Sequence, residues 1–266
     1  MSLRLRSRLE SAAHWRNSMP KAKHVVVTGG GRGIGAATAR RFKNLGFRVT
    51  LMARNRSEIE PLADEIEAYA VRVDVGDPAS VEAAFMAAGP VDVLVNNAGM
   101  VRPSLVTKTD VRVWEEHLKV NLTGAFLCAL KVLPGMTSRG SGRIINVAGT
   151  YGMRGEAYMA AYCASKAGLI GFTKALAAEV GHQGVTVNAV CPGYVDSPLM
   201  DVALQNIAER SDTPREEIEA RLKSRSPQGR VLTPDEVAES ITFLASAGAI
   251  GINGHALVID GGELAC

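Results

Sequence analysis

The stretch HVVVTGGGRGIG, residues 24–35, decides the fold of this chain of 266 residues. It begins with an apolar β-rich run, His24–Thr28, and its glycine-rich turn leads into a helical pattern, Ile34–Leu45. Glycines allow a backbone to approach a pyrophosphate closely, and the N-terminus of a helix attracts its negative charge. Because a strand precedes this turn and a helix follows it, the stretch predicts a dinucleotide-binding turn rather than a flexible loop.

Short apolar runs and helical patterns alternate along the rest of the chain. The runs are apolar on both faces, as expected of strands that helices cover on both sides. Strict alternation predicts an α/β fold with one seven-stranded parallel sheet and right-handed crossovers. The predicted strands are His24–Thr28, Arg48–Met52, Ala70–Val73, Val91–Val95, Arg143–Val147, Val185–Val190 and Ala256–Ile259.

The helical patterns between these strands show no linker or repeat that would divide the chain, so residues 21–266 are predicted to form one domain. A proline at position 134, inside the fourth helix, predicts a kink or an end there. The predicted helices are Ile34–Leu45, Arg56–Glu67, Ala79–Ala88, Asp110–Thr137, Ala157–Val180 and Asp235–Ser246.

Charge and composition limit the partners that the chain can have. Residues 1–23 carry a net charge of +5, which leaves −2 for the remainder, so nucleic acid is not expected as a partner. We interpret residues 1–20 as a tag or disordered extension outside the fold. No membrane span is expected, because no uninterrupted apolar run reaches about 18 residues. Scattered cysteines favour a reducing, cytoplasmic location, and the scattered histidines predict no metal site.

The end of the second predicted strand indicates which dinucleotide binds. An NAD site places an acidic residue there to bind the ribose 2′-hydroxyl, but this chain has Ala53-Arg54-Asn55. Arg54, together with Arg32 in the glycine turn, offers two guanidinium groups that suit a 2′-phosphate. The sequence therefore predicts NADP(H). Each arginine taken singly could equally be a solvated surface charge.

Tyr162 and Lys166 lie four residues apart in the fifth predicted helix, and so on one face of it. A lysine ammonium beside a tyrosine hydroxyl favours the phenolate. It would lower the tyrosine pKa from about 10 towards neutrality and create a proton donor and acceptor for acid–base catalysis. The alternative is that the spacing arises by chance.

Seven ordered motifs resemble those of the classical short-chain dehydrogenase/reductase family, over nearly all of residues 23–262. The resemblance implies a Rossmann-type doubly wound domain and NADPH-dependent hydride transfer to a ketone or 3-oxoacyl-type carbonyl. The motifs are Thr28–Gly35, Asp74-Val75, Asn96–Gly99, Asn121, Tyr162-x-x-x-Lys166, Asn188–Gly193 and Asp260-Gly261-Gly262.

The resemblance also implies roles for individual residues. Tyr162 would protonate the carbonyl oxygen, Lys166 would bind the nicotinamide ribose and tune Tyr162, and Asn121 would hold a water of a proton relay. Asp74 would meet the adenine, with Val75 beside it. The cofactor-binding residues implied are Gly29, Gly31, Arg32, Gly33, Ile34, Arg54, Asn55, Asp74, Val75, Asn97, Ala98, Gly99, Tyr162, Lys166, Pro192, Gly193, Val195 and Ser197.

One position departs from the family pattern. The family places a serine thirteen residues before the tyrosine, and this chain has Gly149 there. The loss of one such hydroxyl donor typically slows turnover by ~10²–10³. We expect the neighbouring Thr150 to supply a hydroxyl and complete the catalytic set, whereas Tyr151 is less suited because of its reach. The alternative is an NADP(H)-binding protein with weak or lost catalysis.

Substrate choice is expected to depend on residues 196–230. Their apolar stripe and the basic residues after it predict either a lid over an acyl chain with a basic rim or, as the favoured interpretation, an ordinary amphipathic helix pair. The segment resembles members that act on 3-oxoacyl thioesters, and Gly254–Cys266 resembles the family's subunit-pairing segment, which implies a homotetramer or homodimer. The residues concerned are Leu199, Met200, Val202, Ala203, Leu204 and Ile207, then Arg221, Lys223, Arg225 and Arg230.

Overall fold

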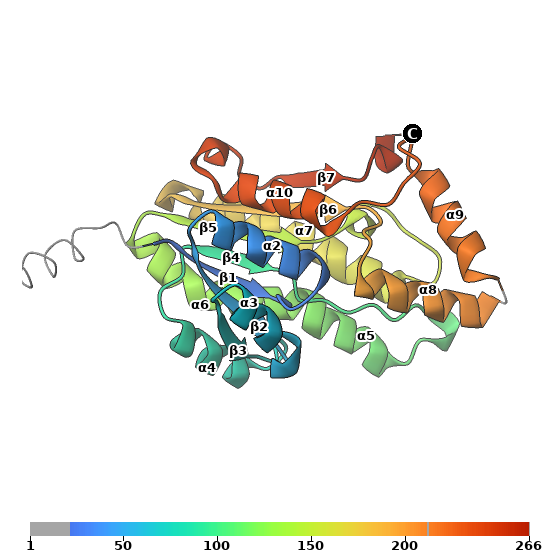
Figure 1. Ribbon diagram of the computed structural model, residues 1–266, viewed down its shortest axis with the longest axis horizontal. Helices are drawn as coiled ribbons and strands as arrows, with labels where there is room; N and C mark the ends of the chain where they lie inside the picture. Colours follow the sequence, from blue (N-terminus) through green and yellow to red (C-terminus); the bar gives the residue numbers. More distant parts are fainter. Residues whose placement is uncertain (1–21, 212, 266) are drawn as a thin grey trace, which may run out of the picture.

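The computed structural model describes residues 22–211 and 213–265, so the extension predicted for residues 1–20 lies outside the described part of the chain. Within that part, one sheet of seven strands has the order β3-β2-β1-β4-β5-β6-β7 (Figure 1). Every pairing in it is parallel, as predicted. The strands are β1 His24–Thr28, β2 Arg48–Ala53, β3 Tyr69–Arg72, β4 Val93–Asn96, β5 Gly142–Val147, β6 Val185–Pro192 and β7 Ala256–Ile259.

Strand β1 lies inside the sheet, where it pairs with β2 on one side and with β4 on the other. The sheet is built outwards from β1 in one direction by β2 and β3, and in the other by β4 to β7. The crossover connections therefore lead outwards in one direction from β1 and in the opposite direction from β4, so the strand order reverses between these two strands. In open parallel sheets, ligands bind in the crevice at the carboxyl ends of the strands that flank such a switch point.

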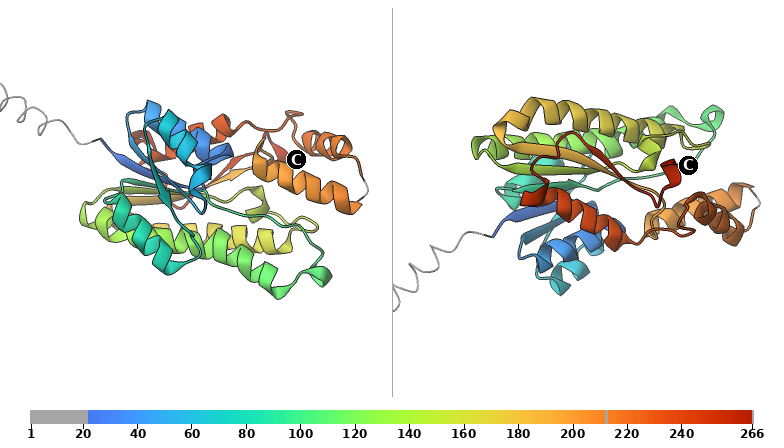
Figure 2. Two further views of the ribbon diagram at one scale, coloured as in Figure 1. Left: turned by 60° about the horizontal axis from the view of Figure 1, so that its bottom comes forward. Right: turned by 90° about the horizontal axis from the view of Figure 1, so that it is seen from above.

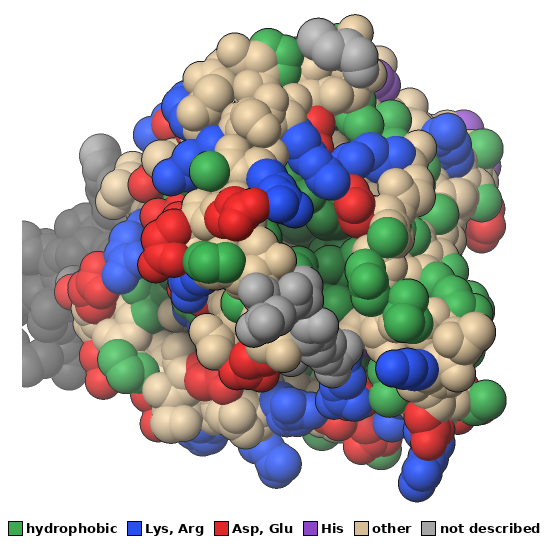
Figure 3. Space-filling model, turned by 90° about the vertical axis from the view of Figure 1, so that its right-hand side faces the viewer, with side chains coloured by type: hydrophobic (Ala, Val, Ile, Leu, Met, Phe, Trp, Pro, Cys, Tyr) green, Lys and Arg blue, Asp and Glu red, His purple; other side chains and the backbone are tan. Residues whose placement is uncertain are grey.

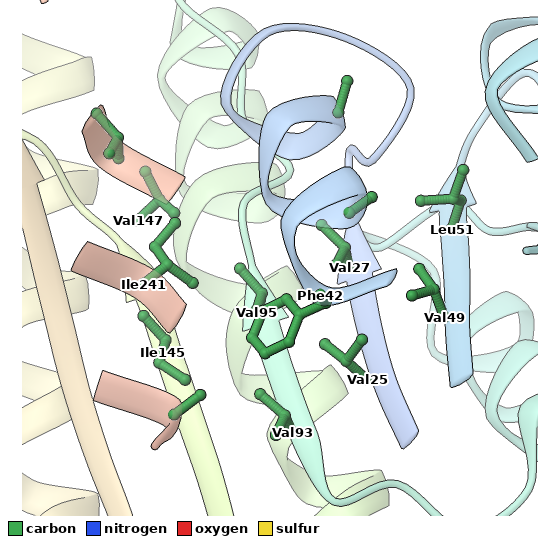
Figure 4. Packing of buried hydrophobic residues seen from close by; sticks show 14 of the residues in the cluster. Val25, Val27, Phe42, Val49, Leu51, Val93, Val95, Ile145, Val147 and Ile241 are labelled. Carbon is green, nitrogen blue, oxygen red and sulfur yellow. The ribbon is translucent and has the colours of Figure 1, made fainter. Parts of the chain in front are cut away.

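Helices cover both faces of the sheet (Figure 2). Alternate residues of β1 point to opposite faces, so Val25 and Val27 belong to one buried cluster and Val26 to the other. Figure 4 shows Phe42 lying over Val25 and Val27 in the first cluster. This face carries α2 Gly33–Asn44, α3 Glu60–Glu65 and α10 Pro234–Ala245, and the other carries α4 Pro78–Ala88, α6 Gly124–Ser138 and α7 Ala160–Val180.

The long helix predicted from Asp110 to Thr137 is continuous but not uniform. Helix α5 (Val111–Leu118) passes into a π-helical turn (Lys119–Thr123) and then into α6. The helix does not end at Pro134. A proline removes only one backbone hydrogen bond, and buried side chains at positions 132 and 136 hold the helix on the core on both sides of it.

This continuous helix also bears on the prediction that the chain does not span a membrane. The span Val111–Ser138 is long and apolar enough to cross a membrane by length and composition alone. In this fold its apolar character has another use, because Cys128 and Ala129 are buried in the layer that covers the sheet. We therefore interpret it as a core helix, of which Phe126 and Leu130 remain exposed.

The other differences from the predicted elements are local. The helix predicted from Arg56 begins as a 3₁₀ turn, Arg56–Glu58, and α3 follows it. Helix α7 begins at Ala160 rather than at residue 157, because Tyr158 has a positive φ of 68° that a right-handed helix cannot contain. Residues 196–230 contain the helix pair α8 Pro198–Ser211 and α9 Arg215–Arg225.

Thr28 ties the carboxyl ends of β1 and β4 together. Its hydroxyl oxygen accepts hydrogen bonds from the backbone amides of Asn97 (3.1 Å) and Ala98 (3.0 Å), and its hydroxyl donates to the carbonyl of Val95 (3.4 Å). Thr28 is 1% exposed, so water cannot replace these bonds without opening the fold. One buried hydroxyl therefore holds the two strand ends that flank the crevice.

We predict that Thr28→Val lowers the free energy of unfolding by about 1–3 kcal/mol, because two partly buried amides lose their acceptor. Urea unfolding measures the effect. Thr186→Val is the matched control, since the buried Thr186 hydroxyl on β6 has no hydrogen-bond partner in the described part of the chain. Equal losses in the two variants would contradict the role assigned to Thr28.

Candidate functional site

Two cavities meet at the carboxyl ends of the strands. One, called the nucleotide cavity below, has a volume of about 530 Å³ and lies over the glycine turn and the ends of β2 and β3. The other, called the substrate cavity below, has a volume of about 410 Å³ and lies between α7, the end of β6 and the pair α8 and α9. Ile34, Asn97, Gly99 and Ser197 line both cavities, so the two form a continuous site. Figure 3 shows this side of the molecule hollowed, with hydrophobic side chains in the hollow.

The glycine turn is shaped for close approach to the backbone. A Cβ on Gly31 would collide with the carbonyl oxygen of Glu58, and a Cβ on Gly35 with that of Gly29. Helix α2 follows, and its N-cap residue, Arg32, makes no side-chain capping bond; its first turn holds no acidic residue. Its first amides therefore remain available for an anion. The turn fits the pyrophosphate of a dinucleotide.

Asn97 has a structural task besides its predicted place at the cofactor site. Its side-chain amide donates to the carbonyl oxygens of Thr28 (3.0 Å) and Gly29 (2.9 Å), and so clamps the glycine turn to the end of β4. It lines both cavities while both its amide hydrogens serve the fold. From the sequence, an asparagine at this position that binds the fold cannot be distinguished from one that only contacts the cofactor.

The end of β2 carries the basic groups on which the NADP(H) prediction rests. Arg32 and Arg54 are exposed, and both line the nucleotide cavity. Asn55, also predicted at the cofactor, donates to Glu58 at 2.9 Å. Sequence reasoning missed Arg72 at the end of β3, whose Nε donates to the carbonyl of Arg54 at 3.2 Å. It places a third guanidinium beside the same strand end.

All eighteen predicted cofactor residues line one or both cavities. The predicted catalytic residues divide differently, because Tyr162 and Lys166 line the substrate cavity whereas Asn121 and Thr150 do not. The nucleotide cavity holds Gly29, Gly31, Arg32, Gly33, Ile34, Arg54, Asn55, Asp74, Val75, Asn97, Ala98, Gly99 and Ser197, and the substrate cavity holds Tyr162, Lys166, Pro192, Gly193 and Val195.

The pKa values of the Tyr162 and Lys166 pair differ from expectation. Burial raises the pKa of Tyr162 above its ordinary value, so the predicted lowering is wrong for this arrangement. Burial also lowers the pKa of Lys166 to about 8. The Lys166 ammonium lies 5.6 Å from the centre of the Tyr162 ring and donates to the carbonyl oxygen of Val147 at 2.8 Å. Desolvation is the largest cause of both shifts in pKa.

Asn121 joins three parts of the site. It lies in the π-helical turn, a feature often found at functional sites. Its side chain accepts from the amide of Met100 (2.8 Å) and donates to the carbonyl of Met100 (3.0 Å) and to Ser165 Oγ (3.0 Å). Ser165, which sequence reasoning missed, donates in turn to the carbonyl of Tyr162 at 2.7 Å. Asn121 thus positions the loop after β4 against α7.

The position of the missing serine has an unusual backbone. Gly149 has φ 88° and ψ 161°, a region that is essentially restricted to glycine. The 3₁₀ turn after it buries Thr150, which is 2% exposed. Tyr151 instead lines the substrate cavity, and its ring packs edge-on against Tyr162 with 5.7 Å between the ring centres. The proposed use of the Thr150 hydroxyl stays a prediction, and the cavity-facing side chain is Tyr151.

The helix pair α8 and α9 forms a wall of the substrate cavity. Met200, Leu204 and Ile207 of α8 line it together with Ile218 and Leu222 of α9. This arrangement favours the interpretation as a lid over an apolar substrate. Val202 lines the nucleotide cavity instead. The side chains of Leu199 and Ala203 lie outside the part of the chain that the structure describes.

The basic rim proposed for this lid is largely neutralised. Arg221 binds Glu217 at 2.5 Å, Arg225 binds Glu156 at 2.6 Å and Arg230 binds Glu236 at 2.7 Å. Exposed pairs of this kind contribute little stability, but their carboxylates offset the positive charge. The rim is therefore less suited to a phosphorylated carrier than the sequence suggested.

Fold and site together define a Rossmann-type oxidoreductase, with a dinucleotide cavity that opens onto a tyrosine and lysine pair. Residues 29–263 match the family model described as enoyl-(acyl carrier protein) reductase. The chain belongs to the short-chain dehydrogenase/reductase family, as its motifs predicted.

Individual relatives cover almost the whole chain. The 3-oxoacyl-[acyl-carrier-protein] reductase FabG of Vibrio cholerae is 38% identical over 248 residues, 91% of this chain and 97% of that protein. Acetoacetyl-CoA reductase of Shinella zoogloeoides is 37% identical over 246 residues, 90% of this chain and 97% of that protein. A solved structure of an actinorhodin polyketide ketoreductase variant with NADPH has a TM-score of 0.86 at 38% identity, covering 91% of this chain and 97% of that one.

We predict that Gly149→Ser destabilises the protein by about 1–3 kcal/mol instead of simply restoring a hydroxyl, because serine is strained in this backbone conformation. Thermal unfolding measures the loss. Gly155→Ser is the control, since a Cβ at Gly155 meets open space and its φ is not positive. A stable Gly149→Ser protein would show that the turn relaxes readily.

We predict that Lys166 makes stability rise with pH. Its pKa is about 8 in the folded protein against about 10.4 for an unperturbed lysine, so the unfolded chain binds more protons between these values. The wild type should gain on the order of 3 kcal/mol over that window relative to Lys166→Met, in urea unfolding at a series of pH values. Lys174→Met, at an exposed site on the same helix, controls for the substitution; a flat difference between wild type and Lys166→Met would refute the burial argument.

Proposed function

We propose that this protein is an NADPH-dependent reductase of ketone or 3-oxoacyl-type carbonyls, with Tyr162 as the acid–base residue. The observation that carries the proposal is the position of Tyr162 and Lys166. Both line the substrate cavity within the continuous site, next to Gly99, which lines both cavities. A carbonyl held there has the nucleotide cavity on one side and a proton donor on the other.

The residues present fit NADP(H), which supplies a hydride when bound. The uncapped N-terminus of α2 would hold the pyrophosphate, and Arg32 and Arg54 would bind the 2′-phosphate. Asp74 and Val75 would flank the adenine. At the other end, Pro192, Gly193, Val195 and Ser197 would orient the nicotinamide carboxamide, and Lys166 would bind its ribose.

The pKa of Tyr162 suits reduction. Because burial raises that pKa, Tyr162 is protonated at neutral pH and can donate to the carbonyl oxygen as negative charge develops there. Lys166, with its pKa near 8, can carry a proton under the same conditions and stabilise the resulting phenolate. Asn121 is linked to the backbone of Tyr162 through Ser165. The relay water expected at Asn121 stays a prediction.

The substrate class follows from the cavity and from the relatives. A volume of about 410 Å³ with apolar side chains from α8 and α9 suits a medium-sized apolar ketone. Relatives named 3-oxoacyl-[acyl-carrier-protein] reductase and acetoacetyl-CoA reductase support a 3-oxoacyl group. The alternative, an NADP(H)-binding protein with weak or lost catalysis, is favoured only by Gly149.

We also propose that the protein is a cytoplasmic homotetramer or homodimer. Strand β7 ends the described sheet, and its four apolar residues are only half-buried. A second apolar surface is formed on α5 and α6 by Val111, Trp114, Phe126 and Leu130, all exposed. Apolar surfaces of this kind suit association with further copies of the chain.

The decisive experiment follows NADPH oxidation with a panel of ketones and 3-oxoacyl thioesters. We predict turnover that Tyr162→Phe lowers by about 10²–10⁴, while Tyr69→Phe, at an exposed tyrosine on β3, leaves it unchanged. NADH should be the poorer donor, and Arg54→Ala should raise KM for NADPH more than for NADH. NADPH binding without turnover on any substrate would instead support the binding-protein alternative.

A further inference from the structure

Two tyrosines and an arginine form a hydrogen-bonded chain in the wall of the substrate cavity. The hydroxyls of Tyr151 and Tyr194 lie 2.8 Å apart, and Arg225 Nη1 donates to the Tyr194 hydroxyl oxygen at 2.9 Å. Tyr151 comes from the turn after β5, Tyr194 from the loop after β6 and Arg225 from the last turn of α9. All three residues line the cavity.

This hydrogen-bonded group of three side chains has one hydroxyl hydrogen that no acceptor within the group takes up. A guanidinium can only donate, so Arg225 takes up no hydroxyl hydrogen. The two tyrosines bring two hydroxyl hydrogens, and the bond between them uses one. No hydrogen bond from either hydroxyl to another acceptor occurs in the part of the chain that the structure describes. One hydroxyl hydrogen therefore remains for a molecule in the cavity.

Arg225 determines which hydroxyl keeps that hydrogen. Its bond to the Tyr194 oxygen polarises the Tyr194 O–H group and makes it the better donor of the pair. Tyr194 then donates to Tyr151, and the Tyr151 hydrogen is the one left over. Tyr151 also packs against Tyr162, with 5.7 Å between the ring centres, which keeps it near the reacting carbonyl.

The charges around these three side chains favour an uncharged hydrogen-bond acceptor on the bound molecule. Arg225 binds Glu156 through both nitrogens, at 2.6 and 3.2 Å. Arg154 also binds Glu156 at 3.2 Å and binds the buried Glu263 at 2.6 Å. Two arginines thus face two glutamates, so the positive charge is offset. Burial raises the pKa of Tyr151, which keeps its hydroxyl protonated.

We propose that Tyr151 is a specificity residue that donates a hydrogen bond to a second, uncharged oxygen of the substrate, separate from the carbonyl that Tyr162 serves. This inference rests on the proposed function and narrows its substrate class. The preferred substrates are ketones with a neighbouring ester, thioester or ketone oxygen. A simple ketone of the same shape leaves the Tyr151 hydroxyl unpaired in a largely apolar cavity.

The test compares ethyl 3-oxohexanoate with 4-nonanone, which has the same chain length and ketone position but lacks both ester oxygens. Tyr151→Phe should lower kcat/KM for the ester about tenfold and leave the value for 4-nonanone within about twofold. Tyr194→Phe should cause a smaller loss on the ester alone, and Tyr69→Phe none. Equal losses on both ketones, or no loss on either, would overturn the inference. Thermal unfolding checks that each variant is folded.

Binding separates this inference from the proposed function. If the wild type reduces neither ketone, the proposed function fails for these substrates, and calorimetric titration of the NADPH-saturated protein decides on Tyr151. A preference for the ester over 4-nonanone that Tyr151→Phe abolishes supports the inference. Equal affinities for the two ligands, or a preference unchanged in Tyr151→Phe, refute it.

Discussion

The tie between the carboxyl ends of β1 and β4 is the contact on which the rest of the site depends. Thr28 accepts the amides that follow β4, and Asn97 returns two bonds to the end of β1 and the glycine turn. The tie lies at the switch point of the sheet, where the crevice opens. From there, Met100 binds Asn121, which reaches α7 through Ser165. The glycine turn and helix α7 are thus parts of one hydrogen-bonded framework.

Burial sets the chemistry inside that framework. Lys166 is 4% exposed and its pKa falls, while the pKa of Tyr162 rises. Both shifts favour the neutral forms, as desolvation requires. A protonated tyrosine beside a lysine with a pKa near 8 is suited to give a proton to a carbonyl and then to be protonated again. Gly149 has a backbone conformation that favours glycine, and both Gly149 and Tyr151 line the cavity where the family pattern has a serine.

Much of this arrangement could be predicted from local pattern. Runs such as Val25-Val26-Val27 are apolar on both faces, which fixed their assignment as buried strands, and predicted strand ends lie within two residues of those observed. The glycine turn could be recognised because its strand and helix flank it directly. Two local features depended on other information. Tyr158 adopts a positive φ, which delays the start of α7, and the predicted helix over Asp110–Thr137 does not end at Pro134, because packing holds it on both sides.

The sequence by itself determined the family, the order of the strands and helices, and many of the residues that line the two cavities, because these follow from motifs, spacing and periodicity along the chain. Only the tertiary structure decided which polar groups are already paired. It assigned the Asn97 amide to the fold, and it joined Tyr151, Tyr194 and Arg225, which come from three separate segments. It also decided the direction of the Tyr162 pKa, since desolvation depends on everything packed around a side chain and not on its neighbour four residues away.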